Sequence, residues 1–122
     1  MKLQASSASA YNTFSGYGDG FVLVNGERFE ANLIVMPQQL LPWGAVSFEA
    51  LQEADFRVLL DLQPEILLLG TGPRQRFPHP RLTRELAARR IGVEAMDLHA
   101  ACRTYNILMA EERRVAAALL FS

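Results

Sequence analysis

A short unbroken apolar run, Ile66-Leu67-Leu68-Leu69, lies between Pro64 and Gly70 and limits the possible folds more than any other part of the sequence. A run of this length without polar alternation is typical of a strand buried on both faces, as in the parallel centre of an α/β sheet. Helical and strand patterns alternate along the chain from residue 54 onward. We therefore predict right-handed crossovers and a mostly parallel central sheet.

Three helices are expected around this strand. Apolar residues recur at helical spacing over residues 51–62, and an apolar stripe predicts a helix over residues 98–110. Between them, Pro80 is suited to the first turn of a helix that Gly92 would end. Residues 93–96 then predict the strand that follows this second helix.

The N-terminal half predicts antiparallel strands. Asn25-Gly26 separates residues 21–24 from residues 28–30, and it is the strongest short hairpin signal because both residues tolerate the positive φ of a type I′ turn. Residues 33–36 predict a third strand, and residues 43–46 predict a weaker fourth one.

Length and composition favour one globular domain. The chain has 122 residues, of which half are hydrophobic and a fifth are charged. We expect a loosely ordered N-terminal arm over residues 1–19 and a single α/β domain over residues 20–122. Residues 115–120 remain ambiguous on pattern alone, since Val-Ala-Ala-Ala-Leu-Leu favours a helix by propensity and a buried strand by its lack of polar residues.

The residue inventory excludes several classes of site. Cys102 is the single cysteine and the chain has two histidines, so an internal disulfide and a cysteine-based metal cluster are excluded and no cofactor is expected. The longest apolar stretch, residues 115–121, is far shorter than the ~20 residues of a membrane-spanning helix. Together with the lack of a signal-like N-terminus, this predicts a cytoplasmic protein without a transmembrane segment. Peripheral association with a membrane complex stays open.

The turn Gly70-Thr71-Gly72 is the first candidate site, because it directly follows the buried strand. Two glycines allow backbone amides to converge on an anion, and a helix N-terminus nearby would strengthen that field. However, Gln75 stands where the third glycine of a dinucleotide fingerprint would fall. The alternative is a tight turn at which backbone segments pack closely.

Charge is distributed unevenly along the chain. Residues 74–90 contain six arginines and one glutamate, a net charge of +5, whereas the whole chain has a net charge of −1. Since guanidinium groups pair with carboxylates and phosphates, this stretch could bind an acidic protein surface or an anionic ligand. The alternative is a solvated helix face. Nucleic acid is not expected, because no aromatic interleaving or known motif accompanies the arginines.

Two candidates lie on the predicted helix over residues 98–110. Cys102 with His99 and Asp97 could be drawn as nucleophile, base and orienting group, but Cys102 falls on the apolar stripe, where a small thiol usually acts as core filler. Arg103 and Asn106 point away from that stripe. They could bind a ligand, or they could fix a neighbouring loop through hydrogen bonds to its backbone.

Several segments resemble a known family. Gly70-Thr71-Gly72, residues 94–97, Ala101-Cys102-Arg103-Thr104-Tyr105-Asn106 and residues 113–119 occur in the order and form typical of bacterial relatives of mitochondrial complex I assembly factor 3. The resemblance implies a three-layer α/β domain with a central mixed sheet, packed helices and a small β-hairpin layer. It also favours a final strand over residues 115–120, although Glu112 stands where the family usually has glycine. It implies no enzymatic activity, and in eukaryotes the family acts by protein contact.

We therefore predict a non-enzymatic protein-binding module, with assembly of a respiratory complex as its role and with no catalytic residue and no bound metal. The partner-binding candidates are Arg76, Arg81 and Arg84. The alternative is a domain that binds a small anion or nucleotide. The candidate ligand-binding residues of that alternative are Gly70, Thr71, Gly72, Arg74, Arg103 and Asn106. The sequence identifies neither the partner nor the oligomeric state.

Overall fold

The computed structural model describes residues 11–122 and contains two β-sheets. The larger sheet has five strands in the order β5-β4-β8-β6-β7. Its strands are β4 (Leu33–Met36), β5 (Gln39–Pro42), β6 (Ile66–Thr71), β7 (Gly92–Met96) and β8 (Val115–Leu120). The smaller, antiparallel sheet consists of β1 (Phe14–Gly18), β2 (Phe21–Val24) and β3 (Glu27–Phe29).

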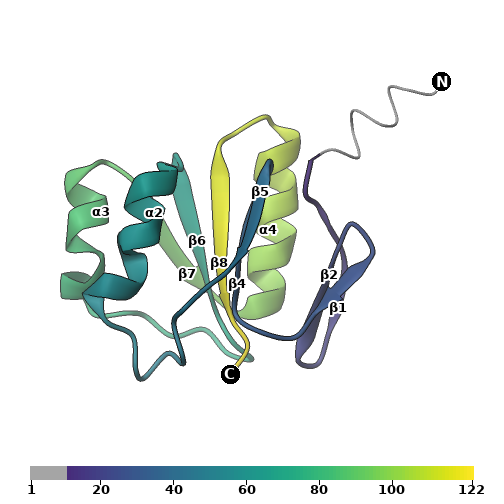
Figure 1. The fold of residues 1–122 in the computed structure, drawn as a ribbon, viewed down its shortest axis with the longest axis horizontal. Coiled ribbons are helices and arrows are strands. Elements are labelled where there is room, and N and C mark those ends of the chain that lie inside the picture. Colours follow the sequence, from purple (N-terminus) through teal and green to yellow (C-terminus); the bar gives the residue numbers. More distant parts are fainter. Residues whose placement is uncertain (1–10) are drawn as a thin grey trace.

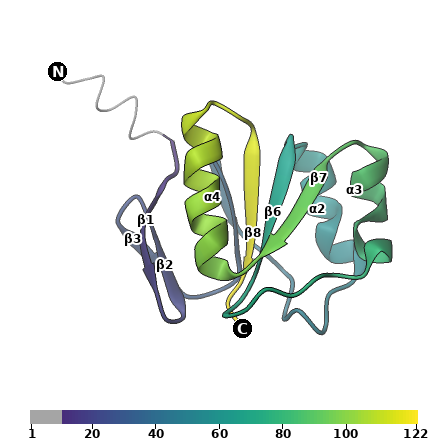
Figure 2. The same ribbon diagram turned by 180° about the vertical axis from the view of Figure 1, so that it is seen from behind.

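The helices lie on both faces of the larger sheet, as Figures 1 and 2 show. The 3₁₀-helix η1 (Glu53–Phe56) leads into α2 (Arg57–Leu62), and η2 (Pro80–Thr83) leads into α3 (Arg84–Ala88). These elements cover one face, while α4 (Leu98–Ala110) covers the other and separates the sheet from β1, β2 and β3. The arrangement confirms the predicted mixed α/β fold with a small additional β layer.

The central sheet is mixed, as predicted, and its parallel part is limited to three strands. β6 pairs in parallel with both β7 and β8, whereas β4 pairs antiparallel with β5 and β8. The segment over residues 115–120 is a strand, and Glu112 adopts a φ of 64° in the turn before it. A tight turn therefore forms at this position although the residue is not glycine.

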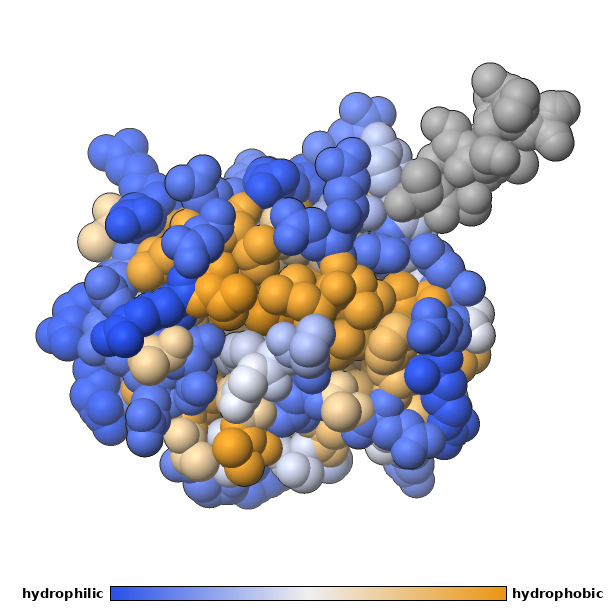
Figure 3. All heavy atoms as spheres, in the orientation of Figure 1, coloured by the Kyte–Doolittle hydropathy of each residue, from blue (hydrophilic) through white to orange (hydrophobic). Residues whose placement is uncertain are grey.

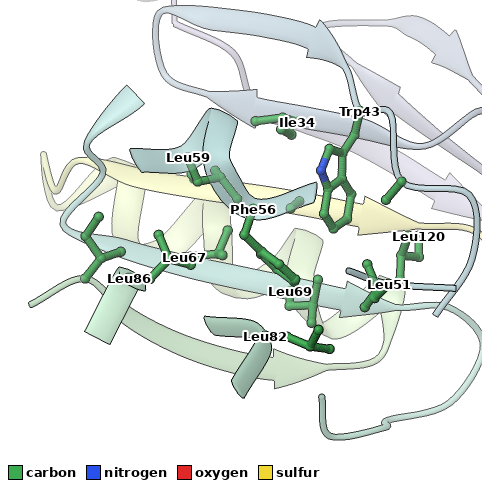
Figure 4. Packing of buried hydrophobic residues seen from close by; sticks show 14 of the residues in the cluster. Ile34, Trp43, Leu51, Phe56, Leu59, Leu67, Leu69, Leu82, Leu86 and Leu120 are labelled. Carbon is green, nitrogen blue, oxygen red and sulfur yellow. The ribbon is translucent and has the colours of Figure 1, made fainter. Parts of the chain in front are cut away.

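Each face of the sheet contacts its own apolar core. Leu67 and Leu69 of β6 pack toward α2 and α3, the cluster shown in Figure 4, whereas Leu68 packs toward α4. β8 alternates in the same way, with Ala116 in the first cluster and Ala117 in the second. Because both faces are buried, these two strands require no polar positions, which explains their continuous apolar sequences.

The hairpin over residues 21–29 is confirmed, and Asn25 and Gly26 adopt φ values of 49° and 85°. The strand predicted over residues 43–46 is wrong. The strand after β4 is β5, which follows a two-residue turn at Pro37-Gln38. Trp43 leaves the sheet because its indole packs against Phe56 in the first core, with the ring centroids 5.7 Å apart.

The helix predicted from Pro80 is shorter than expected. It ends at Ala88, and Arg90 rather than Gly92 takes the left-handed conformation, with a φ of 61°. Gly92 is instead the first residue of β7. Cross-strand pairing of Gly92 with Ile66 fixes this boundary.

Regular structure begins before residue 20, where the N-terminal arm was expected to end. Residues 14–18 form β1, which pairs with β2 and packs on α4. Phe14 is buried, and its ring meets the Tyr105 ring edge to face at 5.1 Å. The first ten residues of the expected N-terminal arm lie outside the described residues.

Candidate functional site

The Gly70-Thr71-Gly72 turn ends β6 under the N-terminus of α4. A methyl group on Gly70 would lie 2.8 Å from Leu119 Cδ2 and 3.3 Å from Ala101 Cβ, so this glycine permits close packing of the helix on the sheet. Gly72 has a φ of 87°, and its carbonyl accepts a hydrogen bond from the Leu98 amide at 2.8 Å. Packing at Gly70 and the positive φ at Gly72 therefore explain why glycine stands at both positions.

The polar groups of this turn have partners within the chain. The Thr71 hydroxyl is buried, donates to the Arg74 carbonyl at 2.7 Å and accepts from the Arg76 amide at 3.0 Å. At the start of α4, an Asp97 carboxylate oxygen accepts from the Ala100 amide at 2.8 Å. These contacts favour a tight structural turn over an anion cradle.

Arg76 joins three separate segments. Its guanidinium donates to the Thr71 carbonyl at 2.6 Å, to the Ser122 main-chain oxygen at 3.1 Å and to Glu49 at 3.0 Å. The Phe48 ring lies 4.6 Å from the same group. Only 14% of the side chain is exposed. Arg76 therefore holds the loop after β6 in place and offers little of its side chain to a partner.

Arg103 and Asn106 contact the hairpin rather than the turn. The Asn106 amide oxygen accepts from the Phe14 amide at 2.9 Å, and its nitrogen donates to the Phe14 carbonyl at 2.8 Å. Arg103 donates to the Tyr17 hydroxyl at 3.2 Å, and this hydrogen bond raises the pKa of Arg103 above its ordinary value. The six candidate ligand residues thus form two groups with separate contacts.

Asn12 is a structural residue that the sequence analysis missed. Its side-chain nitrogen lies 2.9 Å from the Met36 carbonyl oxygen and 3.0 Å from that of Gln39. Its own carbonyl accepts from the Tyr105 hydroxyl at 2.8 Å. One asparagine therefore connects the β4–β5 turn with α4. No local pattern distinguishes it, because its partners are more than twenty residues away along the chain.

Cys102 lies inside the second core, as expected of a filler residue. Burial raises the pKa of its thiol to about 12, and the nearby Arg103 opposes this shift only in part. His99 stacks on Tyr17, and its Nε2 lies 3.0 Å from the Gly18 carbonyl oxygen. These contacts do not assemble the drawn triad, and a thiol with this pKa stays protonated near pH 7. Burial also raises the pKa of Tyr105.

The remaining arginines of the basic stretch are exposed and come from η2, from the loop before it, from α3 and from the two residues that follow α3. We call this set the α3 basic face: Arg74, Arg81, Arg84, Arg89 and Arg90. Arg84 lies 3.9 Å from Glu53 with 70% of its side chain exposed, so this ion pair restrains it little. Phe77 in the same stretch is 75% exposed. A large exposed aromatic in the same short stretch as several exposed arginines is typical of a protein-contact surface.

Comparison with known proteins now identifies the family. The model of a family described as protein of unknown function (DUF498/DUF598) matches residues 14–120. The chain belongs to this family. A Bos taurus member named NADH dehydrogenase [ubiquinone] 1 alpha subcomplex assembly factor 3 is 36% identical over 97% of this chain. The match covers 65% of the bovine protein, slightly less than two thirds of its length. The predicted relationship to complex I assembly factor 3 is thereby confirmed.

Two bacterial relatives are matched over almost their whole length. A Francisella tularensis protein named 13 kDa major membrane protein is 28% identical, with 98% of this chain and 99% of that protein covered. A crystal structure of a Bordetella parapertussis protein is 43% identical, covers 93% of this chain and 98% of that chain, and superposes with a TM-score of 0.87. The fold described above is thus a fold of this family.

The described part of the chain contains neither a cluster of metal-binding side chains nor a membrane-spanning helix. Residues 11–122 contain no cluster of three or more His, Cys, Asp or Glu side chains that could hold a metal ion. In the same range, no helix combines the length and apolar character that are needed to cross a membrane.

Proposed function

We propose that this chain is a non-enzymatic protein-binding module that acts as an assembly factor for a respiratory complex. Its relatives named as assembly factors support this role. The observation that carries the proposal is the α3 basic face, where five exposed arginines and the exposed Phe77 come from one short stretch of a chain with a net charge of −1.

The charge of this surface indicates the chemistry of the partner. Because arginine forms bidentate hydrogen bonds with carboxylates, the complementary surface is acidic. Arg81 and Arg84 are the central residues of the proposed contact, since both are exposed on consecutive helical turns of η2 and α3. Arg76, predicted as a third contact residue, is proposed to position the loop that precedes them.

The proposed place of action is the cytoplasm, with peripheral contact to a membrane complex. A family member named as a membrane protein supports this contact. The segment responsible would be the α3 basic face, because basic clusters are attracted by acidic partners over distances of about a Debye length.

Affinity capture with charge-reversed variants tests the proposal. The variant with Arg81→Glu and Arg84→Glu is expected to lose a protein that the native chain recovers, with an almost unchanged melting temperature. The matched control carries Arg28→Glu and Arg103→Glu, two exposed positions on β3 and on the part of α4 that contacts β1. It changes the net charge by the same amount and is expected to retain the partner. Retention by the first variant would contradict the proposal.

A further inference from the structure

The outer edge of β7 indicates how the proposed partner could be recognised. β7 ends the five-stranded sheet, and within residues 11–122 no strand lies along its outer side. An open edge presents backbone N–H and C=O groups that a further strand can pair with. The opposite edge strand, β5, includes Pro42, which has no amide hydrogen to donate. β7 is therefore the better of the two edges for adding a strand.

The direction of the free backbone groups follows from two contacts. The Met96 carbonyl oxygen lies 3.2 Å from the Thr71 hydroxyl at the end of β6, so it points inward. The preceding carbonyl, that of Ala95, accepts a hydrogen bond at 2.9 Å from the side-chain amide of Gln75 in the loop before η2. Since successive carbonyls alternate between the two edges of a strand, the backbone groups of Val93 and Ala95 point outward. The Gln75 amide occupies the position that an amide of a neighbouring strand would take.

A groove runs beside this edge and gives it side-chain selectivity. Two hollows of about 330 and 430 Å³ meet at Thr83 and Val93. Phe77 lines the hollow at the Ala95 end of β7, and Arg90 lines the hollow at the Gly92 end. Alternate side chains of an added strand would enter this groove. An apolar residue would pack on Phe77, and acidic residues would meet the α3 basic face.

We propose that β7 binds an extended, acidic segment of the partner protein by β-strand addition. This inference rests on the proposed function, because it specifies how the same surface recognises its partner. Backbone hydrogen bonds to the Val93 amide and carbonyl and to the Ala95 amide hold the segment, while Gln75 keeps the Ala95 carbonyl. Phe77 anchors one of its apolar side chains, and the arginines of the α3 basic face select its carboxylates.

A synthetic peptide in which Glu alternates with Val is the probe for this site. The full chain is titrated with it, and amide hydrogen exchange is followed by NMR at Val93 and Ala95. The Glu peptide is expected to slow exchange at both amides. A peptide with Lys in place of Glu should not bind, and a Glu peptide with N-methylated edge-facing amides should not slow exchange. Failure of the Glu peptide to bind, or equal binding of the N-methylated peptide, would overturn the inference.

Two variants test the contact residues. Ala95→Pro removes an outward-facing amide hydrogen but no bond to β6, and it is expected to weaken peptide binding about tenfold. Its matched control, Ala95→Ser, keeps the amide hydrogen and should bind like the native chain. Phe77→Ala alters an exposed loop side chain, so the fold is retained, and a similar loss is expected. Native affinity in both Ala95→Pro and Phe77→Ala would overturn the assignment.

The outcomes separate this inference from the proposed function. If the captured partner is lost by Arg81→Glu with Arg84→Glu but is retained by Ala95→Pro and Phe77→Ala, strand addition is wrong and the proposed function stands. If all of these variants retain it, the proposed function is wrong as well. Binding of the native chain to vesicles of anionic lipid, with no effect of Ala95→Pro, would assign the surface to a membrane and overturn the inference.

Discussion

Replacement of Asn106 by alanine separates the structural and the ligand-binding interpretations of α4. The side chain makes two hydrogen bonds to Phe14, one to its amide and one to its carbonyl, at 2.9 and 2.8 Å. Each such bond contributes about 1 kcal/mol, and truncation also leaves both groups of a partly buried backbone position without a partner. We therefore expect Asn106→Ala to lower the free energy of unfolding by about 2–3 kcal/mol. For a chain of this size the melting temperature should fall by about 10 °C.

Urea denaturation followed by far-ultraviolet circular dichroism measures this loss. Asn106→Asp keeps the acceptor but sets a carboxylate oxygen against the Phe14 carbonyl oxygen, so it is expected to cost at least as much. Arg103→Ala, on the same helix, removes one exposed contact with Tyr17 and should leave the stability almost unchanged. A loss below about 0.5 kcal/mol for Asn106→Ala would refute the assigned bracing role.

Three further predictions concern the turns and the core. Gly70→Ala places a methyl group 2.8 Å from Leu119 Cδ2, and overpacking should cost about 1–3 kcal/mol in urea denaturation while capture of a partner persists; an unchanged stability would contradict the packing role. Glu112→Gly removes the strain of a φ of 64° and should raise the free energy of unfolding by about 1 kcal/mol, whereas a decrease would argue against a left-handed turn there. The pKa of Cys102 is raised from 9.0 to about 12 by burial, so the unfolded chain loses this proton first as the pH rises. Stability should therefore decline between about pH 9 and 12 with a contribution of up to about 1.4 kcal/mol per pH unit that Cys102→Ala removes; equal slopes for the two proteins would show that the thiol is accessible.

Most of the elements in the C-terminal half could be predicted from the sequence, because their patterns are local. The apolar run of β6 and the stripe of α4 each encode an element without reference to distant residues. β1 and β5 could not be found in this way. β1 is rich in Gly and Ser, and its order comes from contacts of Phe14 with α4. β5 was missed because Trp43, which follows it, has the strand propensity but enters the core instead.

The contacts of the candidate site were even less predictable from local sequence patterns. The two glycines make the Gly70-Thr71-Gly72 turn conspicuous in the sequence, but the contacts that fix its polar groups are long-range. Thr71 meets Met96, and Arg76 reaches Ser122, which is 46 positions away along the chain. These contacts occupy polar groups that could otherwise have bound an anion. Sequence spacing alone cannot distinguish these two uses of the same groups.

Whether the α3 basic face binds a protein is decided by a titration with the recovered partner. The purified partner is added to the native chain and to the Arg81→Glu, Arg84→Glu variant at low and at physiological salt. Binding is expected to be at least about tenfold weaker for the variant, with a difference that shrinks as salt screens the exposed charges. Equal affinities at both salt concentrations would contradict this expectation.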